Sequence, residues 1–304
     1  MTPDTLNSDG LAVPGLDPAA AQRWARRLPV DSPWLHEEVA RRMAQRLQWF
    51  REKPSSWLHW EPVNGGIEAH RLLCETLPEA DCRVWALNMA RGLSATREPA
   101  KRSWNPKHWR AAREALPQDL AAPVAMLWAN MVLHHEAAPR NLMRAWHGAL
   151  KTDGFVMFSC LGPDSLKELR SVYSRMGWPA PSHNYTDMHD WGDMLAASGF
   201  AEPVMDMERI NLSFSTAQAL LDELRGLGRN LSSARFRGLR GRRWHAALCN
   251  ALETQLPRDE EGRLALTFEV VYGHAFKPQP RVPMAAEQSV SVADMRAMLW
   301  SSRE

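Results

Sequence analysis

Short apolar runs alternate with helical segments through the first half of this 304-residue chain. The runs at 56–60, 83–87, 123–129 and 154–160 have the length and apolar content of buried strands, and helices are expected between them. A strand, a helix and a second parallel strand form a right-handed crossover unit. Because helices cover both faces of a parallel sheet, the pattern predicts a doubly wound, mostly parallel α/β fold.

The second half of the chain adds longer elements. We expect one helix that opens at Pro163 and another that ends before Gly199, strands at 204–214 and 267–276, and helices at 35–52, 67–76, 139–150, 217–227 and 240–256. The charged stretch 91–120 fits a helix with a degenerate strand near Trp109.

The domain organisation follows from these elements. We expect a loose N-terminal tail over 1–30, one domain over 31–280 and a C-terminal tail over 281–304. Within the domain, 31–160 and 161–280 form two halves with separate tasks.

Bulk composition excludes several classes of protein. The net charge of +2 favours neither nucleic acid nor a membrane, and no apolar run is long enough to span a bilayer. The start of the sequence lacks the pattern of a signal peptide. The four cysteines form no Cys-x-x-Cys pair, which argues against zinc or thioredoxin-like sites and predicts reduced, buried thiols. We therefore expect a cytoplasmic monomer without a metal site.

Four phrases in the second half occur in a specific order: Leu161–Leu166, Asp187–Asp190, Met205–Ile210 and Val270–Ala275. Together they resemble the malonyl-carrier-protein O-methyltransferases of biotin synthesis. The similarity is dense from about Asn141 to Lys277, and before residue 140 it lies in the order of strands and helices. The resemblance implies a class I methyltransferase that uses S-adenosylmethionine to esterify the free carboxyl of a malonyl thioester on an acyl carrier protein.

The implied chemistry limits the residues that are needed. A carboxylate is already ionised at neutral pH, so no general base is required and no catalytic residue is assigned. An arginine fork suits the malonyl carboxylate, and Arg209 is the candidate, with a surface pairing to Glu208 or Glu202 as the alternative. Tyr185, His183 and His189 could line the same pocket, or serve as helix caps and packing residues.

The cofactor loop departs from the family pattern, in which the first strand ends in an acid and a Gly-x-Gly-x-Gly turn follows. Here His59 stands at the acid, Glu61 and Val63 replace two glycines, and Gly65 remains. Val63 is expected to resist the positive φ of a glycine. The Gly65-Gly66 pair before a helix still leaves a ligand-friendly helix N-terminus.

Further acids of the cofactor site are also replaced. The second strand is followed by Asn88 where a ribose-binding acid is expected, Ala112 stands at the adenine-binding acid, and Pro29-Val30 replaces a Tyr-Asp pair. The substitutions predict weak binding of the donor unless Glu61 accepts hydrogen bonds from its ribose or faces its sulfonium. The candidate cofactor-binding residues are Glu61, Gly65, Gly66, Asn88 and Asn130.

A basic stretch lies between Glu223 and Glu253, where no acidic residue occurs. It holds seven arginines, at positions 225, 229, 235, 237, 240, 242 and 243. Such a surface favours an acidic partner, and acyl carrier proteins are acidic; docking is assigned to Arg240, Arg242 and Arg243. The alternatives are a solvated face or pairing with Glu168 or Asp222. No nucleic-acid recognition motif accompanies the charge.

Three functions fit these observations. The chain is an active carboxyl O-methyltransferase, a non-catalytic homologue that keeps the fold and the partner surface, or an enzyme of the same fold with another acceptor.

Overall fold

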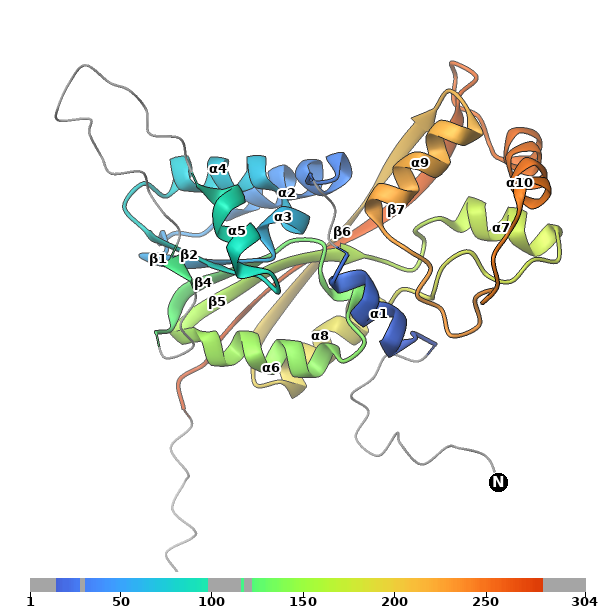
Figure 1. Ribbon diagram of the computed structural model, residues 1–304. Helices are drawn as coiled ribbons and strands as arrows, with labels where there is room; N and C mark the ends of the chain where they lie inside the picture. Colours follow the sequence, from blue (N-terminus) through green and yellow to red (C-terminus); the bar gives the residue numbers. More distant parts are fainter. Residues whose placement is uncertain (1–14, 28–30, 98–115, 118–121, 281–304) are drawn as a thin grey trace, which may run out of the picture.

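One mixed sheet runs through the computed structural model, which describes residues 15–27, 31–97, 116–117 and 122–280 (Figure 1). Its seven strands lie in the order β3-β2-β1-β4-β5-β7-β6, and β7 runs in the direction opposite to the other six. The strands are β1 (Ser56–Trp60), β2 (Asp81–Trp85), β3 (Leu116–Pro117), β4 (Val124–Ala129), β5 (Leu150–Leu161), β6 (Ala201–Phe214) and β7 (Leu264–Phe276). The predicted doubly wound, mostly parallel sheet is confirmed.

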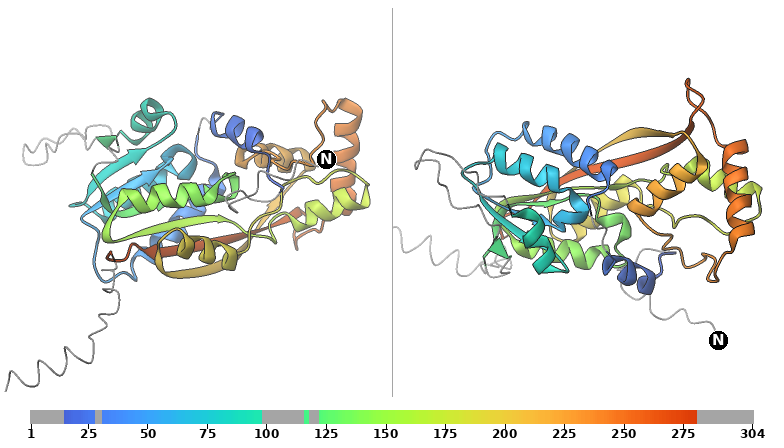
Figure 2. Two further views of the ribbon diagram at one scale, coloured as in Figure 1. Left: turned by 90° about the horizontal axis from the view of Figure 1, so that it is seen from below. Right: turned by 45° about the horizontal axis from the view of Figure 1, so that its top comes forward.

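Helices cover both faces of the sheet (Figures 1 and 2). One face carries α2 (Trp34–Leu47), α3 (Pro62–Gly65), α4 (Ile67–Thr76) and α5 (Met89–Thr96), and the other carries α6 (Pro139–Ala149) and α8 (Met188–Ala197). Successive strand residues point to opposite faces, so Trp57 joins the core under α2 and α4 while Leu58 joins the core under α6 and α8. Burial of both faces explains why the inner strands are continuous apolar runs.

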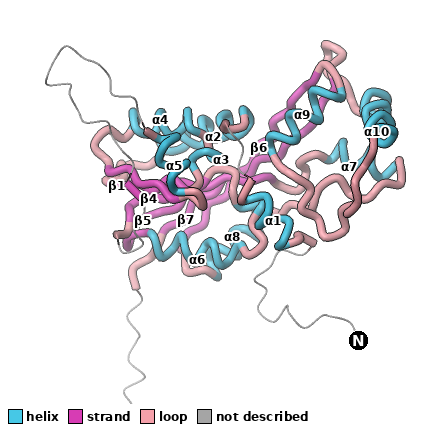
Figure 3. Tube along the Cα trace, viewed as in Figure 1, coloured by secondary structure: helices cyan, strands magenta, loops and turns pink. Residues whose placement is uncertain are grey.

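Three further helices gather at one end of the molecule, around the extended ends of β6 and β7 (Figure 3). They are α7 (Lys167–Arg175), α9 (Ala217–Leu227) and α10 (Arg242–Gln255). β6 and β7 belong to the same sheet as β1 and β4, so the two halves expected at 31–160 and 161–280 share one sheet. No described helix has both the length and the apolar character needed to cross a membrane.

Several boundaries differ from the sequence-based expectations. β2 lies two residues earlier than predicted because its pairing with β1 matches Ser56 to Asp81. The helix predicted to reach residue 52 ends at Leu47, and Phe50 instead stacks on Phe155 with ring centroids 4.4 Å apart. The helix expected from Pro163 begins at Lys167, because Leu166 has a φ of 59° and interrupts a helical path.

Part of the expected N-terminal tail is folded. Helix α1 (Pro18–Ala25) begins after Asp17, whose side chain accepts hydrogen bonds from the helix N-terminus and pairs with Arg235 at 2.7 Å. Trp24 packs against Leu231, so contacts far along the chain hold the segment in place. The rest of the two expected tails, the strand expected near Trp109, and Ala112 lie outside the described residues.

Candidate functional site

The carboxyl ends of β1 and β4 meet where the strand order reverses, which is the position at which doubly wound sheets bind ligands. The loop over residues 61–66 follows β1, and a turn containing Asn130 follows β4. The candidate site is therefore built from this edge of the sheet.

The loop after β1 keeps a sharp turn although two of the family's three glycines are replaced. Positive φ occurs at Glu61 (53°) and Gly66 (114°), whereas Val63 lies inside the short helix α3. Val63 was expected to resist a positive φ, and it does not adopt one, because the turn places its left-handed residues at Glu61 and Gly66. A side chain at Gly66 would also lie 2.7 Å from Glu37 Oε2, so glycine is required there.

Glu61 sends its carboxylate across to the end of β2. Its Oε1 accepts a hydrogen bond from the Leu87 N–H at 2.6 Å, and its Oε2 is buried without a hydrogen-bond partner. Burial raises the pKa of Glu61 to about 7. A carboxylate thus stands beside the end of the second strand, where the resemblance predicts a ribose-binding acid, although it comes from the first strand. The site fits a hydroxyl-bearing cofactor in this respect.

The side chain of Asn88 is engaged at the start of a helix. Its side-chain oxygen accepts a hydrogen bond from the Arg91 N–H at 3.1 Å and caps α5. An N-cap oxygen already engaged in this way is less available to a ligand hydroxyl. Of these two candidate cofactor residues, Glu61 has a carboxylate oxygen without a hydrogen-bond partner, whereas the Asn88 oxygen is used as a helix cap.

Asn130 joins three segments of the candidate site. Its buried side-chain amide donates to the carbonyl of His36 at 2.8 Å and to that of Gly65 at 2.7 Å, and its oxygen accepts from Ser159 Oγ at 2.6 Å. These bonds use both N–H groups and the oxygen. Asn130 therefore holds the loop that contains Gly65 in position from below.

Replacing Asn130 with alanine should lower the free energy of unfolding by roughly 2–5 kcal/mol, since several buried polar groups would lose partners that are worth about 1–3 kcal/mol each. Urea unfolding measures this change. Asn250→Ala makes the same substitution at an exposed position on α10 and should stay within about 0.5 kcal/mol of wild type. Equal stability of the two variants would contradict the role of Asn130.

The N-terminus of α4 is already satisfied by the chain itself. Glu37 accepts hydrogen bonds from the N–H groups of Glu68 and Ala69, both at 3.1 Å, and Ser32 Oγ accepts from Ile67 N–H at 3.0 Å. The expectation of an open, ligand-friendly helix N-terminus after Gly65-Gly66 is corrected by these contacts. An acidic side chain takes the place of an anionic ligand.

His59 occupies the position of the family's acid and is fully buried. Its Nδ1 lies 3.0 Å from Nδ1 of His70 on α4, and its Nε2 has no hydrogen-bond partner. Burial, followed by the charge of His70, holds the pKa of His59 well below its usual range. The imidazole is therefore neutral and packs under the loop, since a side chain at Gly65 would lie 3.0 Å from it.

A second part of the site is a cavity of about 270 Å³ between the sheet and the helices of the second half. It reaches from Trp244 on α10 to Leu161 at the carboxyl end of β5, and leucine is the most frequent residue in its walls. Polar side chains enter it as well, among them those of Tyr185, His135 and Arg229. The cavity combines apolar walls with a few polar groups, as small-molecule sites do.

Of the loop residues named from the sequence, Tyr185 lines this cavity and His189 does not. Burial raises the pKa of Tyr185 to about 12, so its hydroxyl stays protonated. His183 packs beside it with ring centroids 4.8 Å apart and hydrogen-bonds to the carbonyl of His134. His189 is exposed at the start of α8 and bonds to the capping residue Asp187 at 2.7 Å. His189 is thus placed as a helix-end residue.

Arg209 pairs with Asp164 at 2.6 Å and is half exposed. Neither of the expected alternatives, Glu208 and Glu202, is this partner. Glu208 instead bonds to Arg42 and accepts a hydrogen bond from the Tyr272 hydroxyl. Asp164 belongs to the loop after β5 that supplies Leu166 to the cavity. Arg209 itself does not line the cavity, but it holds the loop that does.

Arg229, which the sequence placed only in the basic stretch, lines the cavity directly. Its guanidinium donates to the carbonyl of Gly228 at 2.7 Å, and burial and then the neighbouring Arg225 lower its pKa. No carboxylate among the described residues pairs with Arg229 in the structure, whereas Arg225 pairs with Asp222. The sequence offered no signal that separates Arg229 from the other six arginines.

The remaining arginines divide into paired and unpaired groups. Arg235 pairs with Asp17, while Arg240 stacks on the Trp244 ring with its guanidinium carbon 3.9 Å from the centroid. Arg242 and Arg243 are exposed in the first turn of α10, which contains no acidic residue. Cations at a helix N-terminus oppose the helix dipole by about 0.3–1 kcal/mol, so these two residues do not serve helix stability. The suggested pairing of this group with Glu168 is not seen, because Glu168 bonds to Thr267.

The strand order, the lone antiparallel β7 and the loops at the carboxyl edge define a class I methyltransferase fold. No protein-family model matches the chain. Curated relatives named malonyl-acyl-carrier-protein O-methyltransferase come from Gallionella capsiferriformans (38% identical, over 82% of this chain and 86% of the relative) and Laribacter hongkongensis (37%, over 81% and 84%). The chain belongs to the family of malonyl-acyl-carrier-protein O-methyltransferases.

Solved structures show more distant likenesses. The YcgJ protein of Bacillus subtilis is 13% identical with a TM-score of 0.49, covering 80% of this chain and 99% of that one. A methyltransferase of Archaeoglobus fulgidus is 12% identical with a TM-score of 0.38, covering 78% and 94%.

Proposed function

We propose that the chain transfers a methyl group from S-adenosylmethionine to the free carboxylate of a malonyl thioester on an acyl carrier protein, as a cytoplasmic monomer with no nucleic-acid partner. The observation that carries the proposal is the cavity that joins the arginine-bearing helix α10 to the carboxyl edge of the sheet. A carrier protein docked on α10 would send its thioester arm through that cavity. Family membership supports the same substrate.

On the donor side, S-adenosylmethionine supplies a methyl group on a positively charged sulfur. Glu61 is the residue proposed to hold it, because the partnerless Oε2 can accept hydrogen bonds from sugar hydroxyls. Gly65 and Gly66 keep the loop close to the ligand, and Asn130 fixes that loop by its bond to Gly65. Asn88 acts through the start of α5 that it caps.

On the acceptor side, Arg229 is proposed to bind the malonyl carboxylate. A cation that is partly desolvated beside a second cation gains a partner when an anion enters the cavity. The protonated Tyr185 hydroxyl adds a donor, and the apolar part of the lining reduces the contact of the reacting carboxylate with water. No proton needs to be removed, since the carboxylate is ionised; the residues therefore work by holding the two reactants in line.

Arg209 is proposed as a positioning residue. Its pairing with Asp164 holds the loop after β5, and that loop carries Leu166 in the cavity wall. His189 has no assigned contact with the acceptor in this proposal, because its side chain is exposed beside Asp187.

The test compares malonyl- and acetyl-loaded carrier protein as methyl acceptors. Wild type should methylate the malonyl form and not the acetyl form, which lacks the carboxylate. Arg229→Gln should lower kcat/KM for the malonyl form by roughly 10- to 150-fold, because a hydrogen bond to a charged group is worth about 1.5–3 kcal/mol. Arg263→Gln, an exposed arginine that pairs with Asp259, is the matched control and should leave kcat/KM unchanged.

The outcomes separate the three functions. Donor binding without methylation of any acceptor would support a non-catalytic homologue. Methylation of the acetyl form at the malonyl rate would show that the carboxylate is not the acceptor.

A further inference from the structure

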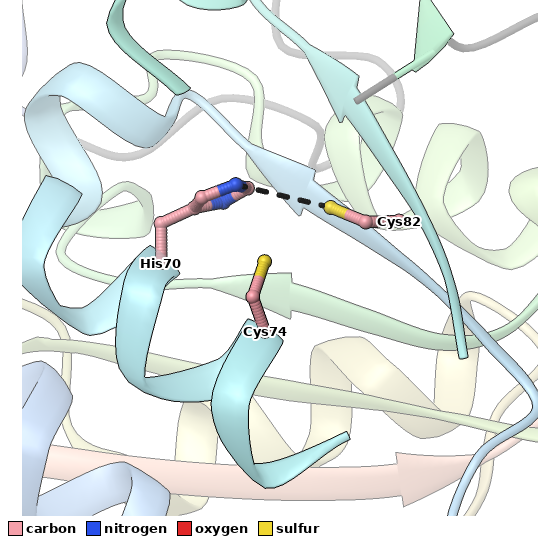
Figure 4. A group of neighbouring side chains, drawn as sticks. All are labelled: His70, Cys74 and Cys82. Carbon is pink, nitrogen blue, oxygen red and sulfur yellow. Dashed lines mark hydrogen bonds between the residues drawn. The ribbon is translucent and has the colours of Figure 1, made fainter. Parts of the chain in front are cut away.

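Three potential metal ligands meet where α4 packs on β2. His70 and Cys74 lie one helical turn apart on the same face of α4, and Cys82 comes from the adjoining strand (Figure 4). Their ligand atoms all lie within 4.8 Å of one another, and His70 Nε2 is 3.9 Å from Cys82 Sγ. His70 and Cys82 are buried, and Cys74 is partly exposed. We propose that these three side chains bind one zinc ion.

The geometry is close to that of an occupied site. Zinc–sulfur bonds of about 2.3 Å and zinc–nitrogen bonds of about 2.0 Å place the ligand atoms of a tetrahedral site roughly 3.5–3.8 Å apart. The His70–Cys82 separation of 3.9 Å is almost at this value. The other separations are at most 4.8 Å. Side-chain rotations that move a sulfur by about 1 Å would bring them to the tetrahedral value. Two thiolates and an imidazole form a soft ligand set that selects zinc over magnesium or calcium.

His59 completes the site from behind. Zinc-binding histidines usually donate their second ring N–H to a neighbouring acceptor, which fixes the tautomer and the ring orientation. With Nε2 of His70 directed at Cys82, its Nδ1–H donates to His59 Nδ1 at 3.0 Å. The substitution of the family's acid by His59 thus has a physical role: this imidazole orients a metal ligand.

The site links the metal to the candidate donor loop. His59 lies under Gly65, where an added side chain would come within 3.0 Å of it. A zinc ion would therefore brace α4, β2 and the floor of the loop as one unit. Three protein ligands leave one tetrahedral position open for a water molecule, and the partial exposure of Cys74 gives solvent access to the site.

The three proposed ligands do not follow the Cys-x-x-Cys pattern whose absence argued against zinc. They are spaced as His70-x₃-Cys74-x₇-Cys82, and the last ligand arrives through the packing of a helix on a strand. The absence of Cys-x-x-Cys therefore does not exclude a metal site in this chain.

Cobalt(II) is the probe for the test, because it occupies zinc sites and reports its ligands by absorption. The full chain, reduced and stripped of metal, should bind one equivalent of cobalt with thiolate charge-transfer bands and the visible bands of a tetrahedral ion. Zinc should displace it and raise the thermal unfolding midpoint. This readout does not depend on methyl transfer, so its failure leaves the proposed function untouched.

Variants locate the ion. Cys74→Ser and Cys82→Ser should each weaken the sulfur charge-transfer bands and lower affinity by more than about 100-fold, and His59→Gln should lower affinity by about 10- to 100-fold while keeping the bands. Cys249→Ser is the matched control, because Cys249 lies 3.9 Å from His245 at the same helical spacing but belongs to no three-ligand group among the described residues. It should bind cobalt as wild type does.

Two results would overturn the proposal: cobalt binding that survives both cysteine substitutions, or no cobalt binding by the reduced wild-type chain. Cys74 is partly exposed, so Cys74→Ser keeps the test decisive if the variant at the buried Cys82 fails to fold.

Discussion

Glu61→Ala should weaken the binding of S-adenosylmethionine by roughly 10- to 150-fold, the largest effect expected at the donor site. The substitution removes a charged acceptor worth about 1.5–3 kcal/mol, and the replaced acids at positions 59 and 88 offer no substitute. Titration calorimetry measures the affinity. Glu68→Ala, an exposed acid on the neighbouring helix α4, is the matched control and should bind as wild type does.

The same carboxyl group gives donor binding a pH dependence. The pKa of Glu61 is about 7, so the group ionises as pH rises from 6 to 8. The affinity of wild type should rise over this interval and then level, while Glu61→Gln should show a flat profile. The folding stability of the ligand-free chain has the opposite pH dependence. The folded pKa lies above the ordinary value of 4.5, so the stability that Glu61 contributes is present below pH 4.5 and is lost as pH rises through about 7.

Wild-type binding that Glu61→Ala leaves unchanged would remove Glu61 from the donor site. A flat wild-type pH profile would show that its ionisation does not matter to the ligand. Either result can be obtained without an acceptor, so the donor proposal is tested by itself.

Reversing Arg240, Arg242 and Arg243 to glutamate should slow association with malonyl-loaded carrier protein by about 10- to 1,000-fold at low salt, the range over which charge steering acts. Arg242 and Arg243 are exposed and oppose the helix dipole, which is expected of residues kept for a partner. Exposed Phe236 and Leu239 beside them supply apolar contact area. Because exposed charges act mainly on encounter, dissociation should change less than association.

Stopped-flow measurements at low and high salt check this prediction. The wild-type rate should fall as salt rises, since charges further apart than about 8 Å are screened at physiological ionic strength. The control reverses three exposed cations at the far end of the sheet, Arg51, Lys53 and Lys151, and makes the same change in net charge. Equal slowing in both triple variants would attribute the effect to net charge instead of the α10 surface.

The presence of the strands and the mostly parallel character of the sheet could be predicted from the sequence because they rest on local signals. The apolar run at 56–60 and the turn after it predict a strand and a crossover whatever the rest of the chain does, and β1 has those bounds in the structure. The four ordered motifs between Leu161 and Ala275 likewise indicated the family, and the curated relatives confirm it. Local sequence patterns do not predict where an element begins and ends. Pairing with a neighbouring strand sets those bounds, as it does for β2.

Only the tertiary structure decided which side chains meet. Glu61 reaches the end of β2, Asn130 ties Gly65 to Ser159, and Arg229 enters the cavity. Each of these contacts joins residues whose separation along the chain has no fixed relation to their separation in space. The physical reason is that sheet order, strand register and helix packing set those distances together, and none of them is encoded within a single segment. The sequence therefore determined the class of fold and the family, while the structure determined which carboxylate, which arginine and which cysteines share a site.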